Sequence, residues 1–227
     1  MICRTLAITA VAVVLVVPGH AHAQAAPAAK PAAQSPARTV EYRPPARGAP
    51  KVRVGGSTRS LARSLTLVVI TPDHVGLAAT EQPELFWYIS QPSKAPIEFS
   101  IVPVDGAEPL LDTTLPAASV AGIHRIRLSD LGVRLKAGEE YQWTIAVPRK
   151  EGSRLKDAVA SGRVRVQSPP ARIDGFAQYA GAGYWYDAVA QLRAQIERQP
   201  GDDALLAAQQ SLLEQVGLAD VVRIDAR

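Results

Sequence analysis

Residues 141–147 carry the clearest strand pattern in the chain, Tyr141-Gln142-Trp143-Thr144-Ile145-Ala146-Val147. Large apolar side chains occupy every second position, and polar Gln142 and Thr144 stand between them. Successive side chains of a strand point to opposite faces of its sheet, so this alternation predicts a strand with one buried face.

Short β-prone runs recur on both sides of this strand, bounded by Pro, Gly, Asp and Ser. They cover residues 65–70, 85–90, 97–104, 108–112, 123–128, 141–147 and 159–166. No helical pattern lies between them, and several short strands at this spacing are typical of an antiparallel sandwich of two sheets. We therefore predict a mainly β chain in which residues 64–168 form an antiparallel β-sandwich.

A local motif sharpens the fold prediction. Residues 135–143 read Leu135-Lys136-Ala137-Gly138-Glu139-Glu140-Tyr141-Gln142-Trp143, and they resemble the entry to the penultimate strand of fibronectin type III and related immunoglobulin-like sandwiches. In those folds a tyrosine at this point bonds through its hydroxyl to nearby backbone. The resemblance implies a fibronectin-like or immunoglobulin-like sandwich of about seven strands. It also implies structural roles for Tyr141 and for the core aromatic Trp87, and we expect the same of Trp143.

The period of the apolar residues changes after residue 168. Apolar side chains then recur every three or four positions, which is typical of amphipathic helices. They are Trp185, Ala188, Val189, Leu192 and Ile196 in one helix, and Leu205, Ala208, Leu212 and Val216 in the next. Pro200 ends the first of these helices, and an Asp after Gly201 caps the second. A shorter helix is expected around residues 173–180.

The stretch 176–200 is similar to one tetratricopeptide unit, because Gly183, Trp185, Ala188, Leu192 and Pro200 stand at the usual offsets of that motif. The resemblance implies a helical hairpin or a three-helix unit over residues 169–218, with residues 219–227 as a tail. One such unit cannot bury its own apolar face. We therefore expect it to pack on the sandwich, on a second copy of the chain or on a partner.

The chain begins with the pattern of an export signal. A basic residue precedes an apolar run over residues 6–17, and a Pro-Gly pair ends the run well short of the roughly 20 residues that a membrane-spanning helix needs. An Ala-His-Ala sequence follows, which predicts cleavage between Ala23 and Gln24, with an uncleaved anchor as the alternative. The mature protein is then expected in the periplasm or outside the cell, without a membrane span. The signal, residues 1–23, contains the only cysteine, Cys3.

The segment 24–63 is predicted to be a linker arm rich in Ala and Pro. Its first half has almost no aliphatic side chain larger than Ala, so it cannot bury enough surface to offset the entropy of ordering. Its second half is basic, and the candidate contact residues there are Arg47, Lys51, Arg53, Arg59 and Arg63. Such an arm is attracted to anionic lipid, polysaccharide or an acidic partner, and export argues against nucleic acid. The alternative is a solvated tether.

Several chemistries lack the residues that they need. A structural zinc or iron–sulfur site requires several Cys or His ligands, whereas the chain after residue 23 offers only His74 and His124. No P-loop and no G-x-S-x-G elbow is present. The sequence therefore predicts no catalytic residue, no metal ligand and no cofactor.

The two histidines have ordinary interpretations as well. His124 shares a strand face with Ile126 and Leu128, which favours a structural residue at the core. His74 follows Asp73 in a turn-forming sequence, and side chains adjacent in a chain rarely face each other. A hydrolase that uses either histidine with a carboxylate is the minor alternative.

A set of motifs is shared with a known family. Among them are Pro72-Asp73-His74-Val75-Gly76-Leu77, Phe86-Trp87-Tyr88, Gly122-Ile123-His124-Arg125-Ile126 and Gly183-Tyr184-Trp185-Tyr186-Asp187-Ala188. Together they resemble the bacterial family known as domain of unknown function 928, from about residue 47 to residue 218. The resemblance implies export and this order of parts, and it brings no activity with it.

These observations favour a non-catalytic binding or scaffold module of the bacterial envelope that binds another protein. Three consecutive aromatic side chains point in different directions around a helix, so Tyr184 or Tyr186 is predicted to face outward as part of a contact surface. The alternative is a module for cell wall or surface polysaccharide, in which sugars stack on Trp87, Tyr88, Trp185 and Tyr186. The oligomeric state is left open.

Overall fold

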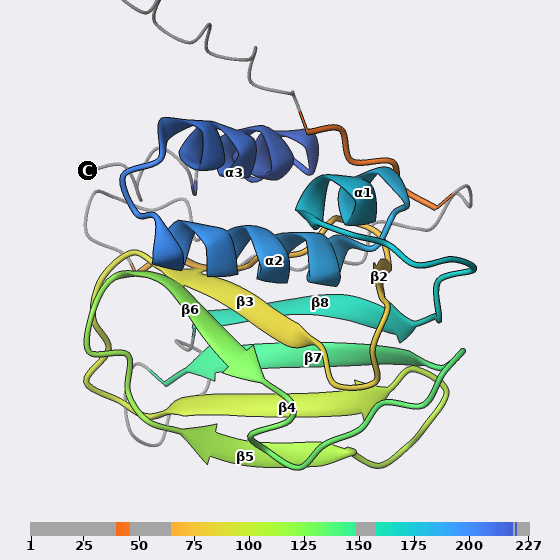
Figure 1. Ribbon diagram of the computed structural model, residues 1–227. Coiled ribbons are helices and arrows are strands. Elements are labelled where there is room, and N and C mark those ends of the chain that lie inside the picture. Colours follow the sequence, from red (N-terminus) through yellow and green to blue (C-terminus); the bar gives the residue numbers. More distant parts are fainter. Residues whose placement is uncertain (1–39, 46–64, 149–157, 220, 222–227) are drawn as a thin grey trace, which may run out of the picture. The chain divides into compact units, whose positions relative to one another are not determined.

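Eight strands form two sheets within residues 40–45, 65–148, 158–219 and 221, which are those that the computed structural model describes (Figure 1). One sheet has the order β1-β3-β6, with β1 at Leu67–Val69, β3 at Glu84–Ile89 and β6 at Gly122–Arg127. The other has the order β2-β8-β7-β4-β5, and its strands in that order are Gly76–Ala78, Ala158–Val166, Glu140–Val147, Ile97–Pro103 and Leu111–Leu115. The prediction of a mainly β chain with C-terminal helices is confirmed.

The prediction of purely antiparallel sheets is wrong for one pair of strands. β2 runs parallel to β8, whereas the other strand pairs among the described residues are antiparallel. β2 was not predicted, because its three residues are too few to show an alternating pattern. β5 begins at Leu111 and not at residue 108, because residues 104–110 form exposed turns.

β7 lies between β8 and β4, and its side chains alternate between core and surface as its sequence predicts. Trp143 and Ile145 are fully buried in this strand. Gly162 of β8 stands opposite Trp143 in the ladder, and a side chain there would overlap Thr71. The missing side chain at Gly162 thus lets Thr71 approach β8 closely.

The three helices are α1 at Phe176–Gly181, α2 at Trp185–Arg198 and α3 at Asp203–Gln215. The predicted cap of α3 is confirmed, because the Asp202 side chain accepts hydrogen bonds from the backbone N–H groups of Ala204 and Leu205. α2 packs on β2 and β3, and its buried side chains belong to the same hydrophobic core as those of the two sheets. The apolar face of α2 is therefore covered by the sheets of its own chain.

The start of α2 is fastened to the sheets through three consecutive side chains. The Trp185 indole N–H donates to the Ile70 carbonyl at 3.0 Å, and the Asp187 carboxylate accepts from the Ala79 N–H at 2.7 Å. Between them, the Tyr186 hydroxyl accepts from the Trp143 indole N–H at 2.9 Å and donates to the Arg163 carbonyl at 3.0 Å.

Burial holds that hydroxyl in its neutral form. The Tyr186 ring is 1% exposed, and desolvation raises the pKa of Tyr186 to about 12. The Thr71 hydroxyl lies 3.0 Å from the Tyr186 oxygen. One side chain of α2 therefore connects the segment after β1 with β7 and β8.

Residues 40–45, here called the strap, cross the helices, although they lie inside the segment predicted as a linker. The Gln215 side chain donates to the Val40 carbonyl at 2.7 Å and accepts from the Tyr42 N–H at 2.8 Å. Val40 and Tyr42 are buried, and Tyr42 meets the Trp185 ring edge-on. The linker prediction is wrong here, because two large side chains in an Ala- and Pro-rich segment suffice to anchor it.

Gly183 explains how closely the strap can approach the turn between α1 and α2. Its φ of 86° is unfavourable for residues with a side chain. A Cβ at this position would also lie 2.9 Å from the Arg43 carbonyl oxygen.

Among the described helices, none is long and apolar enough to cross a lipid bilayer.

The Tyr186 hydroxyl predicts a stability effect. Tyr186→Phe leaves the buried Trp143 N–H and Arg163 carbonyl without this partner, so the free energy of unfolding should fall by roughly 1–3 kcal/mol. Urea unfolding measures it, with Tyr179→Phe as a control at a ring that is only partly buried. An unchanged midpoint for Tyr186→Phe would contradict the role of the hydroxyl.

Asp187 predicts a pH effect. Burial raises the pKa of this carboxyl from 3.8 to about 6, so the folded state favours the protonated form. Its stabilising contribution is therefore complete below about pH 4 and is lost as the pH rises through 6, a change of roughly 3 kcal/mol.

The difference in unfolding free energy between the wild type and Asp187→Asn should follow this course, because Asn can still accept from Ala79. Asp174→Asn controls for the loss of one exposed carboxylate. A difference that stays constant from pH 4 to pH 7 would show that Asp187 titrates normally.

Candidate functional site

A groove runs beside β6, an edge strand of the three-stranded sheet. Its cavity has a volume of about 330 Å³, which lies in the range of ligand pockets. The lining, which defines the β6 groove, consists of Trp87, residues 115–119, residues 124–127, Asp130 and Leu131. Four consecutive residues of β6 line it, so the backbone of the strand borders the cavity as well as its side chains.

The loop between β5 and β6 forms the opposite wall of the groove. The Ala118 carbonyl accepts from the Ser93 N–H at 2.9 Å, and His124 Nε2 donates to the Val120 carbonyl at 2.9 Å. Ala118 itself is buried. The first contact holds the loop to the segment after β3, and the second ties it to β6 beside the groove.

The floor of the groove is aromatic. Trp87 and His124 stand opposite each other in the β3–β6 ladder, and their rings stack with centroids 4.7 Å apart. Because His124 lies over it, Trp87 is only 4% exposed. His124 is partly exposed and lines the groove, so it does not lie within the core as its strand pattern predicted.

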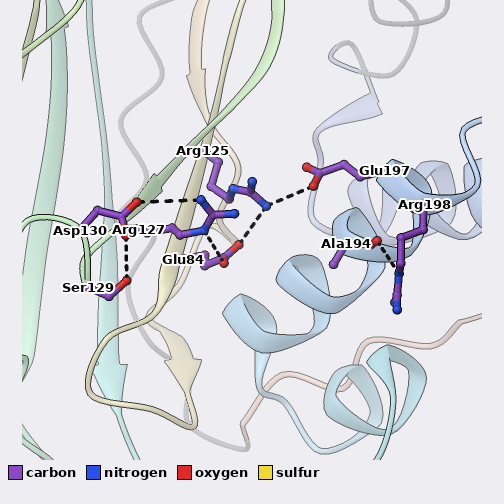
Figure 2. A network of polar contacts seen from close by, with 8 residues as sticks. All are labelled: Glu84, Arg125, Arg127, Ser129, Asp130, Ala194, Glu197 and Arg198. Atoms are coloured by element: carbon purple, nitrogen blue, oxygen red, sulfur yellow. Dashed lines mark hydrogen bonds and ion pairs between the residues drawn. The ribbon is translucent and has the colours of Figure 1, made fainter.

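A network of charged side chains extends from β6, one side of the groove, to β3 and α2 (Figure 2). Arg125 reaches from β6 to Glu84 of β3 at 3.5 Å and to Glu197 of α2 at 3.3 Å. Arg127 contacts Glu84 at 3.1 Å and Asp130 at 3.9 Å. The network ties β6 to both a neighbouring strand and a helix.

Only part of this network lines the β6 groove. Arg125, Arg127 and Asp130 belong to the lining, whereas Glu84 and Glu197 do not. Glu84 contacts both arginines and Glu197 contacts Arg125, so the two guanidinium groups are already paired. The Asp130 side chain is 65% exposed and lies 3.9 Å from Arg127, so its carboxylate can take a further cationic partner.

A second cluster of polar side chains, Tyr42, Asp73 and His74, joins the strap to the turn before β2. His74 Nε2 lies 2.9 Å from the Tyr42 hydroxyl, and Nδ1 lies 3.4 Å from the Asp73 carboxylate. The expectation that Asp73 and His74 face apart is wrong, because the turn brings both side chains to one side. Burial raises the pKa of the Tyr42 hydroxyl well above its usual range, and this hydroxyl occupies His74 Nε2. The cluster fastens the strap and offers no open position to a substrate.

Of the predicted contact residues, the two tyrosines are covered. Tyr184 and Tyr186 are 2% and 1% exposed, so the prediction that one of them faces outward is wrong. The sheets, α1 and the strap surround the start of α2 on several sides, which leaves no outward direction there. The basic residues Arg47, Lys51, Arg53, Arg59 and Arg63 and the cleavage site Ala23–Gln24 fall outside the described residues.

The expected structural aromatics lie in the core. Trp87, Tyr141 and Trp143 are buried, and the Lys136 N–H donates to the Tyr141 hydroxyl at 3.1 Å, as predicted for a tyrosine at this turn. Tyr88 and Trp185 are buried too, so the four aromatics proposed for stacking on sugars are all covered. Among the described residues, no cluster of three or more His, Cys, Asp or Glu is suited to a metal ion.

Sequence reasoning missed the β6 groove. The loop residues 115–119 carry no motif. The charged side chains that contact Arg125 and Arg127 come from elements far apart in the chain. The one available signal was the alternation of Arg125 and Arg127 on β6, which places both guanidinium groups on one face of the strand.

The model of the family described as Domain of Unknown Function (DUF928) matches residues 54–225. No curated protein matches the chain.

Proposed function

Because the chain belongs to the DUF928 family, whose description carries no activity, we propose a function from the geometry of the groove: an exported, non-catalytic module that binds an extended peptide segment of another protein. The observation that carries the proposal is the β6 groove, an open cavity along a strand edge with the exposed carboxylate of Asp130 in its lining. The export pattern of residues 1–23 supports a partner in the periplasm or outside the cell.

The edge of β6 suits an extended peptide. β6 pairs with β3 and, within the described residues, with no second strand. Alternate backbone N–H and C=O groups of such a strand point away from its neighbour and can pair with an added segment. The His124 ring, which stacks on the buried Trp87, lines the groove and can contact side chains on one face of that segment.

Asp130 adds a preference for charge. A lysine or arginine of the bound segment would pair with its exposed carboxylate, whereas an acidic residue at that point would be repelled. We therefore expect basic and apolar residues to alternate in the partner segment.

The architecture is consistent with this proposal. The resemblance to fibronectin-like sandwiches and to a tetratricopeptide unit, which we keep as part of the proposal, points to two kinds of fold that commonly serve as binding modules. Burial of Trp87, Tyr88, Trp185 and Tyr186 removes the stacking surface that the polysaccharide alternative requires.

Fluorescence anisotropy with two labelled peptides tests the proposal. One peptide alternates lysine and valine, and the other alternates glutamate and valine. We expect saturable binding of the lysine peptide and weaker binding of the glutamate peptide. Equal binding of both, or none of either, would refute a groove that selects basic extended segments.

Variants locate the binding site. Asp130→Asn should lower the affinity for the lysine peptide about three-fold, because one exposed ion pair contributes up to about 1 kcal/mol. Asp174→Asn, an exposed carboxylate outside the groove, should leave the affinity unchanged. Equal effects of the two variants would place the peptide elsewhere.

A further inference from the structure

The four outer edges of the two sheets differ in how they are covered. β2 is buried along its length and packs against α2, and the buried side chains of β1 lie against β8. The β6 edge borders the groove described above. β5 is the outermost strand of the five-stranded sheet, as Figure 1 shows, and within the described residues it pairs with β4 alone.

β5 lacks most of the features that protect edge strands. Its sequence, Leu111-Asp112-Thr113-Thr114-Leu115, contains no Lys, no Pro and no bulge, and β-branched Thr favours pairing. Pro109 and Pro116 stand just outside the strand and limit any pairing to the residues between them. Asp112 is the single charge.

The side chains of β5 leave apolar surface at the end of the core. Leu111, Thr113 and Leu115 face the core side and are half-buried, whereas Asp112 and Thr114 are exposed. Leu111 and Leu115 pack against the core cluster from this edge, and the neighbouring Leu110 is 44% exposed. Another strand beside β5 would cover these three side chains.

The strand is complementary to itself. When two copies are placed antiparallel about Thr113, Leu111 of one copy stands opposite Leu115 of the other, and Asp112 stands opposite Thr114. Each pair joins apolar to apolar or carboxylate to hydroxyl, and no like charges face each other. The burial of the paired residues matches as well, because Leu111 and Leu115 are both half-buried, whereas Asp112 and Thr114 are both exposed.

We propose that β5 is the docking surface for a second copy of this chain, which joins the two five-stranded sheets edge to edge through antiparallel β5 strands. The contact is isologous, so it closes as a two-fold dimer. Because only five residues pair, the dimer is expected to be weak and concentration-dependent. The proposal does not rest on the peptide-binding function of the β6 groove.

Charge substitutions at the pair Asp112–Thr114 test the dimer. Thr114→Asp places two carboxylates opposite each other at both ends of the symmetric contact. Sedimentation equilibrium over a wide range of protein concentration should show the wild-type dimer, and the dissociation constant should rise about ten-fold in the variant. Thr114→Ser is the matched control, and it should leave the dissociation constant unchanged.

The double variant Asp112→Lys with Thr114→Asp separates this contact from any other. It places lysine opposite aspartate at both ends, so the dissociation constant should return to within about three-fold of the wild type. Both positions are exposed, so the fold is retained and circular dichroism should be unchanged.

Three results would overturn the proposal: a wild-type protein that is monomeric at every concentration, a Thr114→Asp variant that dimerises like Thr114→Ser, or a double variant that stays as weak as Thr114→Asp.

Discussion

The hydroxyl of Tyr186 is the contact on which the arrangement of helices and sheets depends. It sits fully buried between the Trp143 indole of β7, the Arg163 carbonyl of β8 and the Thr71 side chain. A buried donor or acceptor without a partner costs about 1–3 kcal/mol, so removing this single atom affects several elements at once. Because α2 is held here, it also brings Glu197 to Arg125 of β6.

The two proposed surfaces follow from the same physical problem, which is how each sheet ends. A sheet edge presents backbone groups that seek partners, and a fold must cover, pair or block them. At β6 we propose that the groove between the strand and a loop takes a short extended segment with positive charge. At β5, which within the described residues pairs with β4 alone, the strand is self-complementary, and we propose that a copy of the chain covers it. A peptide site and a self-association site can thus coexist in one small β-rich protein without competing for one strand.

Much of the fold was predictable from local pattern, and little of the site was. The alternation in residues 141–147 and the helical period after Trp185 are local signals, and the structure confirms both. β2 escaped prediction because three residues show no period, and the burial of Tyr184 and Tyr186 depends on elements that close around α2 from distant parts of the chain. The β6 groove likewise depends on a loop without a motif that lies beside β6 and Trp87 of β3. Tertiary packing, which a single sequence does not display, decides each of these features.

The parallel pairing of β2 with β8 has a consequence for how the chain folds. Gly76 meets Val164 across the ladder and α2 packs on β2, so these contacts cannot form until β8 and α2 have been made. Contacts between residues so far apart in sequence carry a large loop-closure entropy and slow the folding of a domain. β2, which is made early, is thus completed only by β8 and α2, which are made in the last third of the chain. Any polypeptide released before residue 187 would expose an unfinished core, so synthesis or transport must deliver the C-terminal helices before the protein is stable.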